Sequence, residues 1–180
     1  MSLKTHAGLV IGLIPVYAET GDACRILCAG TDGASHEWTE KYSTETTRKK
    51  LARLYHLDLA AQAAELQKRY HRAPPLPMFL PDGRVFVPLK LRLPRVKKDP
   101  AYGYLECRSV AKIETGSGGL SQLVLKTGEI ILVYMRLSTA RAMIYSGLEI
   151  RQEYFGWPAE REELQAAFQK LWKFFWHHHS

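Results

Sequence analysis

The chain has 180 residues, of which 46% are hydrophobic and 24% charged, so the composition excludes wholesale disorder and fits one globular domain. A formal net charge of +7 at pH 7 favours an acidic partner. The longest uncharged apolar run, residues 8–18, is shorter than the roughly 20 residues that a membrane helix needs, and polar residues follow it where a signal-peptide cleavage site would lie. We therefore expect a cytoplasmic protein with no membrane contact.

The first third of the chain predicts a small antiparallel meander. Residues 8–17 form an apolar run rich in Val, Leu and Ile, which is typical of a buried strand. A turn over residues 19–22 leads to a second strand at 23–29, and a turn over 30–33 leads to a short strand at 36–42.

Residues 43–72 have the spacing of an amphipathic helix. Apolar side chains recur every three or four positions, at Leu51, Leu54, Tyr55, Leu59, Ala63, Leu66 and Tyr70. Ser43 or Thr44 is suited to cap the helix, and Asp58 to cap a second helix after a break near His56. A DNA-binding helix-turn-helix is the alternative, but the turn has His56 where Gly is common, so we favour a packing role.

Residues 68–98 carry the positive charge of the whole chain. They contain nine Lys or Arg and one acid, Asp82, which gives 9 − 1 = +8 against +7 for the full sequence. Asp82 and Gly83 predict a hairpin turn between strands at 76–80 and 85–91, and Pro77 and Pro88 favour edge strands with accessible side chains.

This basic hairpin is the candidate site. Lys90 and Arg92 would point to the same face of a strand, where a row of cations binds phosphates and an arginine enters a narrow A·T-rich minor groove. A solvated surface with no partner is the alternative interpretation. The candidate DNA contacts are Arg84, Lys90, Arg92, Arg95, Lys97 and Lys98.

The rest of the chain predicts more strands and two helices. Strands are expected at 102–114, 122–126 and 129–135, followed by a short helix that Ser138 caps and Gly147 ends. After Pro158, large apolar residues repeat at helical spacing, which predicts an aromatic helix that docks on the body or on a second subunit. The predicted fold is an α+β domain of antiparallel strands with a central helix, divided into a body at 1–150, a C-terminal helix at 151–176 and a tag-like end at 177–180.

No enzyme chemistry is predicted. Three cysteines, Cys24, Cys28 and Cys107, are too few for a four-ligand zinc site without a histidine partner and are expected to be reduced. No histidine is placed as a base for a nucleophilic thiol, and the Gly-rich loop at 115–119 lacks the Lys-Ser/Thr end of a P-loop. We expect no metal and no cofactor.

The order of these elements resembles the competence transcription factor ComK family. The matching stretches are the strand and Gly-Asp turn at 10–22, HRAPPLP at 71–77, FLPDGRVFVP at 79–88, GYLECRSVAKIE at 103–114 and LVLKTGEIILVYMRLS at 123–138. The resemblance covers residues 8–150. It implies a DNA-binding transcriptional activator that acts as an oligomer on A·T-rich minor grooves, with Arg108, Arg136 and Arg141 as further contacts.

Two other functions remain open. The basic segment would also suit an interaction module for an acidic protein, anchored by the aromatic tail. RNA binding is the other, with Tyr102 and Tyr104 as stacking residues. The expected partner is double-stranded DNA, bound by a homodimer or a higher homo-oligomer.

Overall fold

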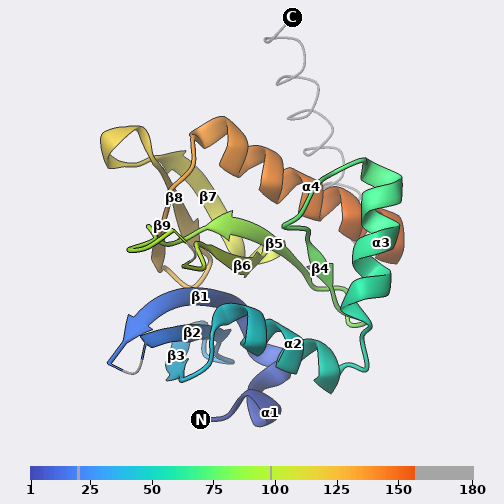
Figure 1. The fold of residues 1–180 in the computed structure, drawn as a ribbon, viewed down its shortest axis with the longest axis horizontal. Helices are drawn as coiled ribbons and strands as arrows, with labels where there is room; N and C mark the ends of the chain where they lie inside the picture. The colour runs from blue at the N-terminus through green and yellow to red at the C-terminus, as the bar shows by residue number, and fades with distance from the viewer. Residues whose placement is uncertain (20, 98, 157–180) are drawn as a thin grey trace, which may run out of the picture.

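A six-stranded antiparallel sheet, here sheet A, forms the middle layer of the molecule (Figure 1). The computed structural model describes residues 1–19, 21–97 and 99–156. The strands of sheet A lie in the order β3-β2-β1-β6-β5-β4. They are β1 (Val10–Ala18), β2 (Gly21–Ala29), β3 (Ser35–Glu40), β4 (Met78–Phe79), β5 (Val85–Lys90) and β6 (Tyr102–Glu106). The first three form the predicted meander.

A second sheet, sheet B, is a three-stranded meander in the order β7-β8-β9. Its strands are β7 (Val110–Thr115), β8 (Ser121–Leu125) and β9 (Ile130–Val133). We predicted one strand over residues 102–114, but a 3-10 turn, η2 (Cys107–Ser109), divides it and carries the chain from β6 of sheet A into β7 of sheet B.

The helices begin at the predicted caps in the central segment. Ser43 Oγ accepts a hydrogen bond of 3.3 Å from the amide of Thr46 at the start of α2 (Thr44–Leu54). Asp58 Oδ1 accepts from the amide of Ala60 at 2.9 Å at the start of α3 (Leu59–Tyr70). Between the helices, His56 has φ 52°, a left-handed conformation that breaks the helix where the sequence predicted a break. The other helices are α1 (Leu3–His6) and α4 (Leu137–Phe155), with short 3-10 turns η1 (Ala7–Leu9) and η3 (Ser117–Gly119).

The central strands of sheet A are buried on both faces, and consecutive residues of each strand point to opposite sides. Ile26, Phe86 and Tyr104 pack with Leu51 of α2 on one face. Their neighbours Leu27, Val87 and Leu105 pack on the other face against sheet B and α4. Figure 1 shows the resulting layers: α2, sheet A, and sheet B with α4. The prediction of a single α+β domain of antiparallel strands is confirmed.

The predicted edge position of β5 is wrong. β5 lies between β6 and β4, and residues 85–89 are all buried. Of the two strands of the predicted hairpin, β4 alone lies at an edge of the sheet, and β3 forms the opposite edge. Pro88 is tolerated because β4 pairs only with Val85 and Phe86, so at Pro88 the strand has one neighbour, β6.

The predicted end of the last body helix at Gly147 is also wrong. α4 continues through this residue to Phe155, past residue 151, where we expected a separate helix to begin. A Cβ on Gly147 would lie 2.4 Å from Val87 Cγ1, so glycine is needed for close packing of α4 on β5 rather than for a helix stop. The N-cap is Arg136, without a side-chain hydrogen bond, and not Ser138. The predicted aromatic segment, with its docking, and the tag-like end lie outside the described residues.

Candidate nucleic-acid interface

Arg84, one of the predicted DNA contacts, is buried beside the Asp82-Gly83 turn, with a relative exposure of 8%. Its Nη1 donates to the carbonyl of Val10 at 2.8 Å, and its Nη2 donates to the hydroxyl of Tyr55 at 2.5 Å. Its Nε donates to Asp82 Oδ2 at 3.0 Å. Burial raises the pKa of the Asp82 carboxyl, but the hydrogen bonds and charge of Arg84 outweigh it and leave that pKa below its usual value. Arg84 therefore joins the turn to β1 and is not accessible to a duplex.

Arg92 is also buried, with a relative exposure of 7%. Its Nε donates to the carbonyl of Pro100 at 2.9 Å and its Nη1 to the carbonyl of Val16 at 3.0 Å. Nη2 lies 2.9 Å from Asp22 Oδ1, an ion-pair contact without the angles of a hydrogen bond. The guanidinium carbon stands 3.9 Å from the ring centroid of Tyr17. Arg92 binds β1 to the connection between β5 and β6, so it is unavailable to DNA.

The predicted hairpin therefore does not carry the accessible cations. They lie instead in residues 91–97 and 99, here called the basic loop, between β5 and β6. Arg95 and Lys97 are exposed, and Lys90 at the base of the loop is half-buried. Two apolar side chains, Leu93 and Val96, are 57% and 64% exposed between these cations. The predicted contact Lys98 lies outside the described residues.

The basic loop is held in one conformation by Tyr17 and Asp99. Asp99 Oδ2 accepts from the amides of Arg95 at 3.0 Å and Val96 at 3.1 Å, and from the hydroxyl of Tyr17. The guanidinium carbon of Arg95 stands 4.0 Å from the Tyr17 ring centroid, so this ring contacts both Arg92 and Arg95. The Tyr17 hydroxyl and these amides lower the pKa of the Asp99 carboxyl. The loop presents its cations from a fixed backbone.

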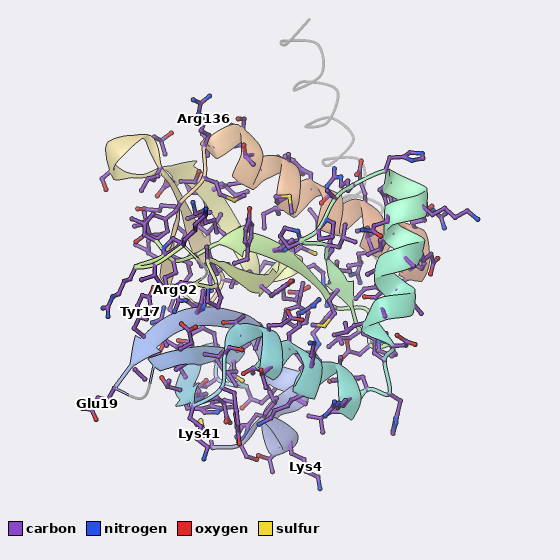
Figure 2. All side chains as sticks on the ribbon, viewed as in Figure 1. Lys4, Tyr17, Glu19, Lys41, Arg92 and Arg136 are labelled. Carbon is purple, nitrogen blue, oxygen red and sulfur yellow. The ribbon has the colours of Figure 1, made fainter. Side chains whose placement is uncertain are left out.

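The arginines implied by the family resemblance are not gathered around the basic loop. Arg108 lies in η2, beyond the end of β6 that is remote from the loop, and its Nε pairs with Glu106 Oε1 at 3.3 Å. Arg136 is exposed where α4 begins, and Figure 2 shows it well apart from Tyr17 and Arg92. Arg141, one turn further along α4, is half-buried. The segment just before Arg136 reaches the base of the basic loop, where the amide of Tyr134 donates to the carbonyl of Lys90 at 2.8 Å.

The aromatic residues proposed to stack on RNA differ in accessibility. Tyr102 is 37% exposed, whereas Tyr104 is 5% exposed and packs in the core beneath Arg48, whose guanidinium carbon is 4.9 Å from its ring centroid. Tyr104 cannot stack on a base without leaving the core.

The three cysteines are buried in the hydrophobic core. Burial raises the pKa of the Cys24 and Cys28 thiols to about 11 and that of Cys107 to about 12, so these thiols stay protonated and are poor nucleophiles at neutral pH. Across residues 1–19, 21–97 and 99–156, no group of three His, Cys, Asp or Glu side chains could hold a metal ion.

A second basic surface was missed by sequence reasoning. It comprises Lys41, Tyr42, Lys49, Lys50 and Arg53, here called the α2 face. Residues 41–57 contain five Lys or Arg and one acid, which gives 5 − 1 = +4. The sum over the chain outside 68–98 hides this charge, because acidic residues elsewhere cancel it. A projection of 43–55 onto a helix, with charge as well as hydrophobicity, would have found it.

Comparisons of the chain with protein-family models, with curated proteins and with solved structures found no match in any of the three.

Proposed function

We propose that this protein is a DNA-binding transcriptional regulator that contacts A·T-rich duplex DNA through the basic loop. One observation carries the proposal: Tyr17 and Asp99 fix a loop from which Arg95 and Lys97 project into solvent. Cations on a fixed backbone neutralise phosphates without the entropic cost of ordering a flexible loop. The resemblance to the ComK family supports the same function.

The apolar side chains of the loop favour contact with a groove rather than with phosphates alone. Leu93 and Val96 are exposed beside Arg95, and minor-groove proteins commonly combine arginine or lysine with small apolar wedges. Arg95 would enter the narrow groove of an A·T-rich site, where the negative potential is strongest. A homodimer would present two such loops to one side of a duplex.

The test is binding to an A·T-rich and a G·C-rich duplex over a salt series. The variant Arg95→Ala/Lys97→Ala is compared with Lys126→Ala, which removes an exposed lysine beside the β8–β9 turn. Each lost phosphate contact reduces the slope of log K against log salt by about 0.9. The slope of the loop variant is therefore expected to be shallower by up to about 2, and the variant is expected to lose its preference for the A·T-rich duplex. Lys126→Ala is expected to behave as the wild type.

The exposed Leu93 and Val96 also suit a protein partner, so the same series includes a polyglutamate peptide and a single-stranded RNA. Binding to polyglutamate but to neither duplex, from folded protein, would contradict the proposal and favour an acidic protein as partner. Binding to RNA alone would favour the RNA alternative, although burial of Tyr104 leaves only one of its two proposed stacking residues.

A further inference from the structure

We propose that the α2 face is a second phosphate-binding surface, which contacts the backbone of the same nucleic acid as the basic loop. This inference rests on the proposed function and extends its site to an element on the other side of the β1–β2 hairpin.

The α2 face is set by the amphipathic pattern of α2. The helix buries Thr44, Thr47 and Leu51 against sheet A. Lys49 and Arg53, four residues apart and therefore on one side of the helix, are exposed, and Lys50 lies beside them. The helix thus packs one face in the core and presents Lys49 and Arg53 on the other, with the half-buried Lys50 at the border.

Tyr42 positions two of the lysines. It lies in the turn between β3 and α2 and is 37% exposed. The Nζ atoms of Lys50 and Lys41 stand 3.1 Å and 5.8 Å from its ring centroid. Contact between an ammonium group and an aromatic ring orients the lysine without neutralising its charge. The positive charge is therefore held in place and remains available to an anion.

The carboxylate within this segment leaves most of the charge uncompensated. Glu45 binds Arg48 through two hydrogen bonds, of 3.0 Å and 2.9 Å, and its Oε1 lies 3.7 Å from Lys49 Nζ. Within the described part of the chain, no carboxylate lies at ion-pair distance from Lys41, Lys50 or Arg53. An exposed face with this excess of cations attracts a polyanion.

The register of sheet A places Lys41, at the β3 end of the α2 face, close to the strand that carries Tyr17. Pro15 of β1 is opposite Cys24 of β2, which is opposite Glu40 of β3. Neighbouring strands are about 4.8 Å apart, so the residue before Lys41 lies roughly 10 Å from the strand that carries Tyr17. Figure 2 shows Tyr17, Glu19 and Lys41 in that order along one edge of the view, with Lys4 further along the bottom. A nucleic-acid backbone spans this separation, whereas a single small anion does not.

The test removes charge from the α2 face with Lys49→Ala/Lys50→Ala/Arg53→Ala and measures the salt dependence of binding to both duplexes. The expected result is a slope of log K against log salt that is shallower by about 2 to 3, equally for A·T-rich and G·C-rich DNA, because phosphate contacts do not read sequence. The matched control Lys49→Arg/Lys50→Arg keeps the charge and is expected to keep the wild-type slope. Circular dichroism verifies that each variant is folded.

The outcomes separate the inference from the proposed function. An unchanged slope in the α2 variant, together with a reduced slope in Arg95→Ala/Lys97→Ala, would overturn the inference and leave the proposed function intact. If the wild type binds neither duplex, both are overturned. Vesicles of phosphatidylserine and phosphatidylcholine form the last arm, since binding to them alone, lost in the α2 variant, would assign the face to an anionic membrane.

Discussion

Arg84 and Arg92 have similar environments, and both use their charge inside the protein. Each donates to a backbone carbonyl of β1, Val10 for Arg84 and Val16 for Arg92. Carbonyls at such sites need a donor once they are removed from water. A guanidinium group has five N–H donors and can therefore bind a carbonyl, an acid and a third group at once.

Replacing Arg92 by alanine is expected to destabilise the fold. It leaves the carbonyls of Val16 and Pro100 without their donor and separates Asp22 from its cation, although Asp22 is partly exposed to water. We expect the free energy of unfolding to fall by about 2–4 kcal/mol, measured by urea denaturation. The control Arg95→Ala removes an exposed side chain and should cost less than about 1 kcal/mol. Equal losses in the two variants would contradict a structural role for Arg92.

The conformation of the basic loop is expected to depend on the ionisation of Asp99. The pKa of Asp99 is lowered in the folded protein. The ionised carboxylate therefore contributes fully to the stability of the folded state above its ordinary pKa of about 3.9, and this contribution is lost as the pH falls through the pKa of the folded state. Tyr17→Phe removes the hydroxyl that lowers this pKa most and should raise it towards the ordinary value. Carboxyl carbon NMR titration measures the change, and an unchanged pKa in Tyr17→Phe would rule out this anchor.

The helix α4 packs closely on β5 at Gly147, in the middle of the helix. Alanine at an ordinary helix position stabilises by about 1 kcal/mol relative to glycine. At position 147, however, the added methyl would lie 2.4 Å from Val87 Cγ1 and 3.1 Å from Cys107 Cβ. Overpacking in a core costs about 1–3 kcal/mol, so the contact outweighs the helix propensity.

Gly147→Ala is therefore expected to lower the free energy of unfolding by up to about 2 kcal/mol in urea denaturation. Gly8→Ala is the control, because a Cβ there meets nothing within 4 Å. A more stable Gly147→Ala protein would show that α4 can shift away from β5 without loss.

The elements that the sequence predicted correctly depend on short-range chemistry. The caps Ser43 and Asp58 and the turn at Gly83 need only neighbouring residues, and the β1–β3 meander follows from apolar runs separated by turns. The central position of β5 and the continuation of α4 through Gly147 depend on partners distant in the sequence. The exposure of Arg95 and Lys97 agrees with the prediction. The burial of Arg84 and Arg92 could not be predicted from charge, because their partners are also distant in the sequence.

For the molecule as a whole, the two hydrophobic clusters share the strands of sheet A and cannot unfold separately. Phe86 and Val87 are adjacent in β5, yet one packs towards α2 and the other towards sheet B and α4. Loss of packing on one face removes support from the strand that forms the other. The described residues should therefore unfold in one cooperative step.

Truncations on opposite sides test this coupling. Leu51→Ala on the α2 side and Leu123→Ala on the sheet B side each remove a fully buried side chain and should cost about 2–5 kcal/mol. Both are expected to shift one transition, seen together by circular dichroism and by hydrogen exchange in β1 and β8. Two separate transitions in either variant would show that the layers are independent.

The basic loop also has a consequence for how such a protein can diversify. It joins β5 and β6, which are paired from Phe86–Glu106 to Lys90–Tyr102, so the core fixes both ends of the loop, while the side chains of Leu93, Arg95 and Val96 are exposed. A change in the exposed residues leaves the stem intact, provided that Arg92, Asp99 and Tyr17 are kept. The exposed residues of the loop can therefore be exchanged without disturbing the strands that support them. A graft of other residues at these positions would change the surface of the loop on the same scaffold.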